Sequence, residues 1–227
     1  MTGPGVLDGG IDEQDRDQVE ASLAVAVAGL LAARTVTAPW LSLTRGALSG
    51  VITAYLQRAA LAMAVAAGLP SGDAAQAASD AVTSVLGDVE RHTASWLRIA
   101  ADDRAPKGGG PMGADQAEQS AGIIARSLAT YARERAREHV ARTLGAGFKT
   151  WMTRGDTQVR PAHAAVAGKT VSIDRPFVVE GSDVVRPGDP DAPLHLTAGC
   201  RCHLAYRVDP QPTRRTTPVL TTGHARG

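Results

Sequence analysis

The sequence predicts an α+β protein, with a mainly helical N-terminal part of about four alanine-rich helices and a small C-terminal α+β module. Apolar residues recur at helical spacing until Gly145 and Gly147, where this periodicity stops. Short β-prone pieces between turn residues follow. Hydrophobic residues make up 44% of the chain but aromatic ones only 4%. The apolar content is therefore mostly Ala, Leu and Val, which favours closely packed helices.

The four helices are each marked by a start or a stop signal. Acidic residues at 12–17 precede the first apolar stripe, 19–31, where they suit the positive end of a helix dipole. Pro39 ends this helix or starts the next, and Gly68-Leu69-Pro70 stops the second. The Gly/Pro-rich segment 106–113 is expected to be a loop or hinge. The later helices are expected over about residues 40–69, 73–102 and 115–144.

The expected domain organisation has four parts. They are a flexible leader at 1–10, a helical domain at 11–147, the α+β module at 148–208 and an extended or disordered tail at 209–227. Strands are expected in the module at residues 169–173, 177–179, 184–185 and 203–208.

Charge and hydropathy limit the possible partners. Lys and Arg number 24 against 23 Asp and Glu, which leaves a net charge of +1 and excludes a strongly basic nucleic-acid coat protein. The N-terminus lacks the basic region of a secretory signal, and the apolar run at 21–33 is too short to span a bilayer. We therefore expect a soluble intracellular protein with no membrane partner.

The two cysteines of the chain, Cys200 and Cys202, stand one residue apart. In a strand both thiols would face the same side and could bind one metal ion, whereas a disulfide between them would need a strained ring. His163 could add a nitrogen ligand to form a structural zinc site. A fourth ligand could come from Asp156, His195 or His203. On a strand, however, His203 would face away from the thiols. The alternative is two buried apolar cysteines beside a hydrogen-bonded histidine.

Polar residues before the cysteines form a second pattern. Asp156, Arg160 and His163 would share one face if their segment were helical, and Pro161 could occupy the first turn of a helix. These groups could carry acid–base chemistry. An ion-paired structural cluster is favoured because no nucleophile is obviously placed. We expect Asp156 and Arg160 to orient the segment through a charge-assisted hydrogen bond.

Arginines offer a possible nucleic-acid contact. Arg133 and Arg137 of the fourth helix could bind phosphates, since arginine suits bidentate phosphate contacts. The basic tail adds Arg214 and Arg215. The alternative for the helix is a solvated face whose arginines pair with Glu134 and Glu138.

The C-terminal module as a whole carries a recognisable order of residues. That order is Trp151, Asp156, Val159-Arg160, His163, Gly168, Pro176-Phe177, Pro187-Gly188-Asp189-Pro190 and Cys200-Arg201-Cys202. Over about residues 148–208 it resembles the C-terminal region of the phage Mu F-like minor head proteins, the phage head morphogenesis family. In that family an Asn or a similar residue often precedes the final Cys-Arg-Cys, and here Gly199 stands there. We expect the module to fold around a structural cluster of Trp151, Asp156, Arg160, His163, Asp189, Cys200 and Cys202.

The resemblance implies a virion protein of a tailed phage, with no established enzymatic activity. It would lie in the head near the portal or capsid interior, and in the host cytoplasm during assembly. Its partners would be the portal protein, the major capsid protein, its own copies and the packaged DNA. A DNA-binding head protein is one alternative. The other is a metal-dependent hydrolase or toxin-like transferase using Asp156 and His163, which predicts an open coordination position and a pocket beside them.

Overall fold

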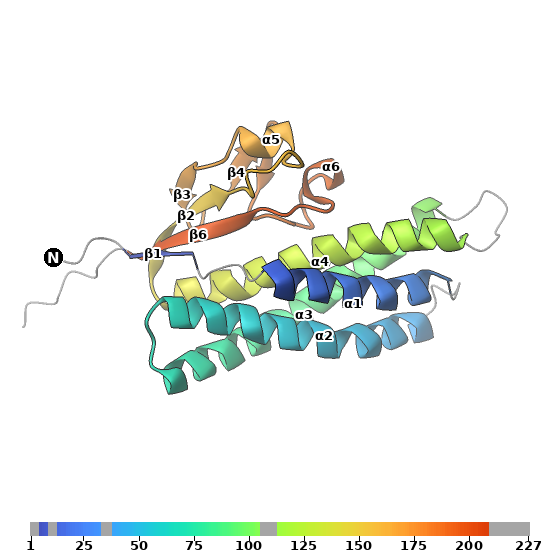
Figure 1. Ribbon diagram of the computed structural model, residues 1–227, viewed down its shortest axis with the longest axis horizontal. Helices are drawn as coiled ribbons and strands as arrows, with labels where there is room; N and C mark the ends of the chain where they lie inside the picture. The colour runs from blue at the N-terminus through green and yellow to red at the C-terminus, as the bar shows by residue number, and fades with distance from the viewer. Residues whose placement is uncertain (1–4, 9–12, 33–37, 105–112, 209–227) are drawn as a thin grey trace, which may run out of the picture.

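Four long helices lie side by side, and a small sheet covers one of them (Figure 1). The computed structural model describes residues 5–8, 13–32, 38–104 and 113–208. The long helices are α1 (Glu13–Ala32), α2 (Ala38–Ala66), α3 (Ser71–Arg104) and α4 (Ala114–Thr143). Helices in the first part and short antiparallel strands in the second confirm the predicted α+β class and its four helices.

Helix α4 is the central element, because it contacts α1, α2 and α3 and also the strands β2 and β6. Its second half is buried almost all the way round. Alanines at 121, 125, 129, 132 and 136 are all buried, and side chains this small let the neighbouring elements approach closely. The helix therefore has one face in the helical core and another under the sheet.

The sheet has four antiparallel strands in the order β1-β6-β2-β3. Their bounds are β1 Gly5–Leu7, β2 Ala146–Met152, β3 Thr170–Ser172 and β6 His203–Val208. A hairpin of β4 (Phe177–Val179) and β5 (Ser182–Val184) lies beside it. The single-turn helices α5 (Pro161–Ala164) and α6 (Leu194–Thr197) complete the module.

All four expected strands are confirmed within two residues, but two strands of the sheet were not predicted. Strand β2 was missed because it contains Gly147 and the buried Lys149, and both residue types are uncommon in strands. β1 lies inside the expected leader, and the structure corrects that interpretation for residues 5–7. Its three residues are held by pairing with β6, a contact between the two ends of the chain that local sequence does not reveal. The expected domain boundary at 147/148 falls inside β2.

The loop before α6 packs directly on α4. A Cβ added to Gly188 would lie 3.0 Å from the main-chain nitrogen of Tyr131 and 3.3 Å from the carbonyl oxygen of Ser127. Gly188 also has a φ of +72°, which favours glycine. Next to it, the buried Asp189 accepts a hydrogen bond of 2.7 Å from the main-chain nitrogen of Val185. This turn therefore sets how closely the loop approaches α4.

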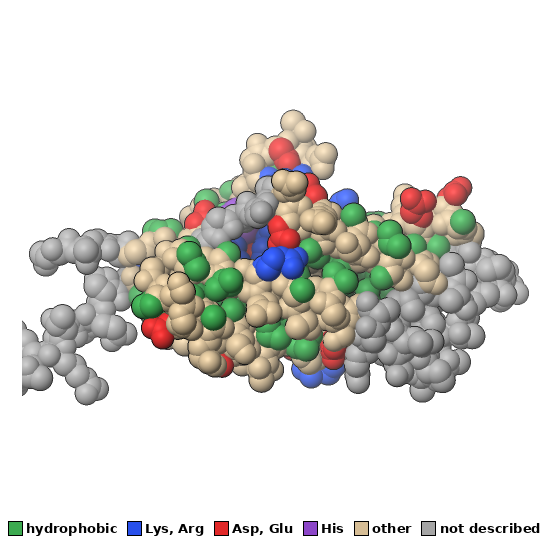
Figure 2. Space-filling model, turned by 60° about the horizontal axis from the view of Figure 1, so that its bottom comes forward, with side chains coloured by type: hydrophobic (Ala, Val, Ile, Leu, Met, Phe, Trp, Pro, Cys, Tyr) green, Lys and Arg blue, Asp and Glu red, His purple; other side chains and the backbone are tan. Residues whose placement is uncertain are grey.

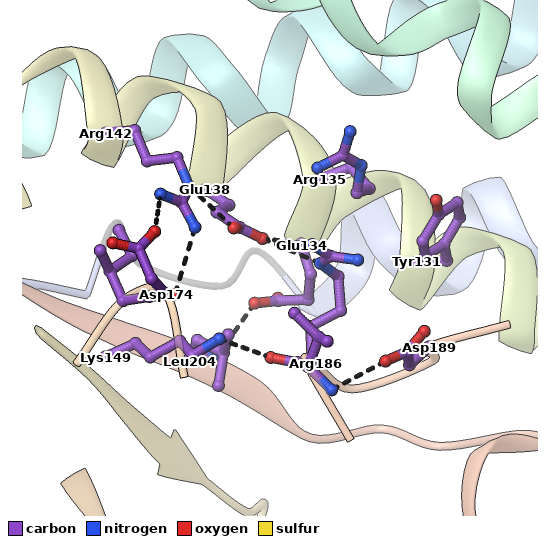
Figure 3. A network of polar contacts seen from close by, with 12 residues as sticks. Tyr131, Glu134, Arg135, Glu138, Arg142, Lys149, Asp174, Arg186, Asp189 and Leu204 are labelled. Atoms are coloured by element: carbon purple, nitrogen blue, oxygen red, sulfur yellow. Dashed lines mark hydrogen bonds and ion pairs between the residues drawn. The ribbon is translucent and has the colours of Figure 1, made fainter. Parts of the chain in front are cut away.

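Charged side chains join the same loop to α4 and β2 (Figure 3). Glu138 accepts hydrogen bonds from Arg186 at 2.8 Å and from Arg142 at 2.9 Å. Lys149 donates to the carbonyl of Val185 at 2.8 Å. Burial lowers the pKa of Lys149 to about 8. These contacts fix the sheet relative to the helices.

Helix α2 contains the stretch Leu48–Ala66, which has a mean hydropathy of 1.3 and by length and composition alone could cross a membrane. Core helices of soluble proteins have the same composition. Here the stretch packs on α3 and α4 through buried residues such as Ile52, Leu56 and Met63. Leu61 and Val65 are among its exposed side chains. On the face that Figure 2 shows, hydrophobic side chains are scattered and charged ones are few.

Candidate metal cluster and arginine cleft

The imidazole of His163 and the thiols of Cys200 and Cys202 meet in the interior of the module. Nδ1 of His163 lies 3.6 Å from the Cys200 sulfur and 3.4 Å from the Cys202 sulfur. All three side chains are buried, and both cysteines are free thiols. We call these three residues the Cys2His cluster. The two thiols face the same side, as predicted, although only residues from His203 onward are in a strand.

The dimensions of the Cys2His cluster suit a metal ion. A tetrahedral zinc with Zn–S of about 2.3 Å and Zn–N of about 2.0 Å places a sulfur and a nitrogen ligand about 3.5 Å apart. The two sulfur–nitrogen distances of 3.6 and 3.4 Å lie on either side of that value. The cluster could therefore hold a metal ion with little rearrangement.

The protonation of the two thiols also suits ligation. The neighbouring Cys202 thiol and His163 hold the pKa of Cys200 well below its usual value. The pKa of Cys202 is raised, because Cys202 shares its proton with Cys200 and is buried. The Trp151 indole opposes that rise. Deprotonation of Cys200 is thus favoured over that of Cys202, and metal binding would release the protons that the thiols hold.

His163 is positioned by its own short helix and by a tryptophan. Arg160 has extended backbone angles, and Pro161 occupies the first turn of α5, where its missing N–H costs nothing. The prediction that Pro161 begins a helix is thereby confirmed. Trp151 of β2 meets the imidazole edge to face, with ring centroids 5.4 Å apart. Its buried indole N–H acts on the Cys202 thiol, whose pKa it lowers, and could donate to a metal-bound thiolate there.

Four side chains of α4 hold the main chain of residues 199–204, which we call the cysteine loop. Gly199 N donates to Ser127 Oγ (2.8 Å), Thr130 Oγ1 to Cys200 O (2.5 Å), Arg133 to Cys202 O (2.9 Å) and Leu204 N to Glu134 Oε2 (2.9 Å). These four α4 residues lie at spacings of three, three and one, which brings them to neighbouring positions on the helix surface. The cysteine loop is therefore fixed to the helical core as well as to His163.

This arrangement corrects the expectation that Arg133 and Arg137 bind nucleic acid. Both side chains are buried, and both contact the fully buried carboxylate of Glu134, at 2.9 and 3.3 Å. The pairing with glutamate was one of the predicted alternatives, but the face is not solvated. Helical periodicity alone could not show that the sheet covers this side of α4. The other two candidate arginines, Arg214 and Arg215, lie outside the described residues.

Asp156 and Arg160 do not bond to each other, contrary to the prediction. Asp156 accepts a hydrogen bond of 2.7 Å from Arg201, which lowers the pKa of the carboxyl group. Arg160 donates to the carbonyl of Ala198. Both residues thus bind the segment around the cysteines, but separately. They also share no helix face with His163, because α5 begins only at Pro161.

No fourth protein ligand joins the Cys2His cluster among the described residues. Asp156 is bonded to Arg201 instead. His195 is exposed and lies 3.7 Å from Glu180. His203 faces Asp8 at 3.3 Å, in agreement with the expectation that it points away from the thiols. Burial lowers the pKa of His203. A metal in the cluster would therefore have three protein ligands from this part of the chain.

A cleft of about 190 Å³ opens beside the cluster, and His163 and Cys202 form part of its wall. Four arginines line the rest of it, together with less polar residues of the same loops. They are Arg126, Arg154, Arg160 and Arg201. Sequence reasoning missed this cleft, because its arginines come from α4, from the segment before α5 and from the cysteine loop. A pocket beside His163 is one of the two features that the enzyme alternative predicts.

Comparison of the chain with protein-family models, with curated proteins and with solved structures finds no match. The resemblance to the Mu F-like minor head proteins therefore stays a prediction from the order and spacing of residues in the module.

Proposed function

We propose that this protein is a structural, non-enzymatic minor head protein of a tailed bacteriophage. The observation that carries the proposal is that residues of the Mu F-like pattern, far apart in the sequence, come together around the cysteine loop and α4. Trp151 and the Cys2His cluster form its centre. Asp156 and Arg160 bind the segment around the cysteines, and Gly188 lies against α4. The pattern residues thus hold the module together and join it to α4, which suits a structural role.

The metal in this proposal is a structural zinc ion held by His163, Cys200 and Cys202. Two sulfurs and one imidazole nitrogen form a donor set typical of zinc. A module of about sixty residues buries little core of its own, so a metal staple would contribute much of its stability. When bound, zinc supplies rigid links between α5 and the cysteine loop.

The helical part is the proposed contact surface for other virion proteins and for further copies of the chain. Three long apolar side chains, Val25, Leu61 and Val65, are exposed on α1 and α2. We propose the portal and the major capsid protein as partners, and assistance in head assembly, DNA packaging or delivery as the role. The protein would lie in the head near the portal or capsid interior, and in the host cytoplasm during assembly, without a membrane partner.

Virions of the phage or prophage that encodes the chain provide the decisive test. We expect mass spectrometry of purified particles to detect the protein in few copies. We expect electron microscopy of particles with the protein tagged at a terminus to place it at the head. Intact, DNA-filled particles from a deletion strain that infect normally would overturn the proposal, as would absence of the protein at every stage of assembly.

A metal-dependent hydrolase is the second candidate function, and the cleft beside His163 and Cys202 favours it. Asp156 is a poor general base for it, because its carboxylate is paired with Arg201 and its pKa is lowered. Zinc-loaded protein tested on activated ester and phosphoester substrates separates the two functions. Zinc-dependent turnover that Cys202→Ser abolishes would support the hydrolase, and the structural proposal predicts none.

The burial of Arg133 and Arg137 argues against DNA binding through α4, because buried side chains are not available to DNA phosphates. A contribution from Arg214 and Arg215 to packaged DNA stays a proposal. It predicts affinity that falls steeply with salt and that weakens in the Arg214→Gln, Arg215→Gln variant. A flat salt response would remove DNA from the list of partners.

A further inference from the structure

We propose that the cleft lined by Arg126, Arg154, Arg160 and Arg201 binds a small oxyanion, of the carboxylate or phosphate class, with one oxygen directed at the Cys2His cluster. We call this cleft the arginine cleft. The proposal concerns a ligand site and does not depend on whether the protein belongs to a virion.

Charge is the first argument for an anion. The four arginines come from three separate segments and surround a cleft of about 190 Å³. Acidic groups partly offset this charge: Asp156 lies 2.7 Å from Arg201 and also interacts electrostatically with Arg154, and Glu20 lies 3.5 Å from Arg126. Neither acid is part of the cleft wall. The lining is thus strongly cationic, and guanidinium groups are the usual partners of carboxylate and phosphate oxygens.

The size of the cleft limits the ligand. A volume of about 190 Å³ has room for several water molecules. It can therefore admit a phosphate, a carboxylate or one acidic side chain together with some water. It cannot enclose a polynucleotide strand, so we infer a small molecule or a single protruding group.

The position of the cleft gives the second argument. His163 and Cys202 form part of its wall, and the described residues supply three ligands to the cluster. Zinc is almost always four-coordinate, so a zinc ion with these three protein ligands would take water or an exogenous ligand in the fourth position. An oxyanion held by the arginines would lie beside that position, and one oxygen could complete the coordination of a bound metal.

The main chain around the cleft is held independently of any ligand. Arg160 is bonded to the carbonyl of Ala198, and Gly199 N to Ser127. Arg160 and Arg201 therefore have structural contacts, and replacing them would disturb the cysteine loop. Arg126 is exposed on α4, and Arg154 is half-buried. The Arg126→Gln, Arg154→Gln double variant is the suitable probe.

The test uses the full chain, zinc-loaded, and isothermal titration with inorganic phosphate and with acetate at low ionic strength. We expect one saturable site per chain, with affinity reduced at least about tenfold in the double variant. Arg91→Gln is the control, because Arg91 is exposed on α3 and only paired within its helix. It should bind like the unmodified chain. Equal binding by the double variant, or no binding of either anion, would overturn the proposal.

Replacing zinc by Co²⁺ tests the direction of the ligand. The visible absorption bands of cobalt respond to a change in its ligands, so added anion should shift them in the unmodified protein and less so in the double variant. Saturable binding with an unchanged cobalt spectrum would place the anion away from the cluster and contradict the proposed geometry. If a single-stranded oligonucleotide binds and phosphate does not displace it, the ligand of the cleft is nucleic acid and the proposal of a small oxyanion is wrong. Absence of the protein from virions would leave these outcomes unaffected.

Discussion

The main-chain carbonyl of Cys202 accepts a hydrogen bond of 2.9 Å from the guanidinium of Arg133. The thiol of Cys202 lies in the Cys2His cluster, and Arg133 belongs to the central helix α4. One residue thus links the candidate metal site to the helical core. Because of this hydrogen bond, loss of the metal should also lower the stability of the helical core outside the small module.

Replacement of both cysteines by serine should lower stability and abolish metal binding. With free zinc about a thousandfold above its dissociation constant, the metal would contribute on the order of 4 kcal/mol. We expect calorimetry to show a lower melting temperature for Cys200→Ser, Cys202→Ser, and elemental analysis to find no zinc. A chelator should destabilise the unmodified chain and leave the variant unchanged. A structural metal is excluded if the unmodified chain, freed of zinc, melts at the same temperature as the variant and added zinc does not raise that temperature.

Glu134→Gln should be among the most destabilising single changes in α4. Glu134 is fully buried and accepts hydrogen bonds from Arg133, Arg137 and Leu204 N. Removing its charge takes the shared buried counter-ion from two buried arginines, of which Arg137 keeps only the more exposed Asp8 at 3.5 Å. We expect a cost of roughly 3 kcal/mol in the free energy of unfolding. Urea unfolding measures this loss. Glu118→Gln, at an exposed site of the same helix, should change stability by less than about 0.5 kcal/mol. Equal effects would mean that Glu134 is solvated.

Gly188→Ala should cost more than the same change at Gly155. Both glycines have positive φ, +72° and +70°, so the backbone penalty of about 1 kcal/mol is common to both variants. Only Gly188 has neighbours, the main-chain nitrogen of Tyr131 at 3.0 Å and the oxygen of Ser127 at 3.3 Å. Gly155 has nothing within 4 Å of an added Cβ. The difference between the two unfolding free energies, expected to be about 1–3 kcal/mol, measures the contact between the loop and α4.

Lys149 should make stability depend on alkaline pH. Burial lowers its pKa to about 8, from an ordinary value of 10.5. Between these values the unfolded chain binds more protons than the folded one, so this group makes unfolding costlier as pH rises from about 8 to 10.5. The gain is on the order of 3 kcal/mol.

The Lys149→Met variant isolates this effect. Buried tyrosines such as Tyr55, whose pKa is raised to about 12, act in the opposite direction above pH 10. The difference in unfolding free energy between the two proteins removes their contribution, because both proteins contain them. The unfolding free energy of the unmodified protein minus that of the Lys149→Met variant should rise between pH 8 and pH 10.5. A constant difference would show that Lys149 titrates normally.

Sequence reasoning found the four helices because their apolar stripes and their stop signals are local. It also found the cysteine–histidine cluster, since Cys200 and Cys202 can face one side in any extended segment. The partners of Asp156 and Arg160 could not be predicted in this way. They are Arg201 and Ala198, about forty residues later, and depend on how the cysteine loop closes.

The environment of Arg133 in helix α4 could not be predicted for the same reason, because its contacts are distant in the sequence. Its charge suggested an exposed side, but Ser127, Thr130 and Glu134 surround it with groups that bind the cysteine loop. The closely spaced buried alanines of α4 are the signal that could have indicated a helix covered on two sides. The arginine cleft had no such signal, because three separate segments form it.

The pairing of β1 with β6 joins Gly5 to Val208 across one edge of the sheet. The described chain is therefore close to a ring, and a short linker between these two residues could close it. New ends could then be opened at the turn after α2, where Gly68 is exposed. A circular permutant of this kind should fold, since Gly68 is exposed and the bond from Leu69 N to Ala64 O is one of few main-chain hydrogen bonds that span it. It would carry its termini at the turn between α2 and α3, so the β1–β6 edge of the sheet would be free of tags.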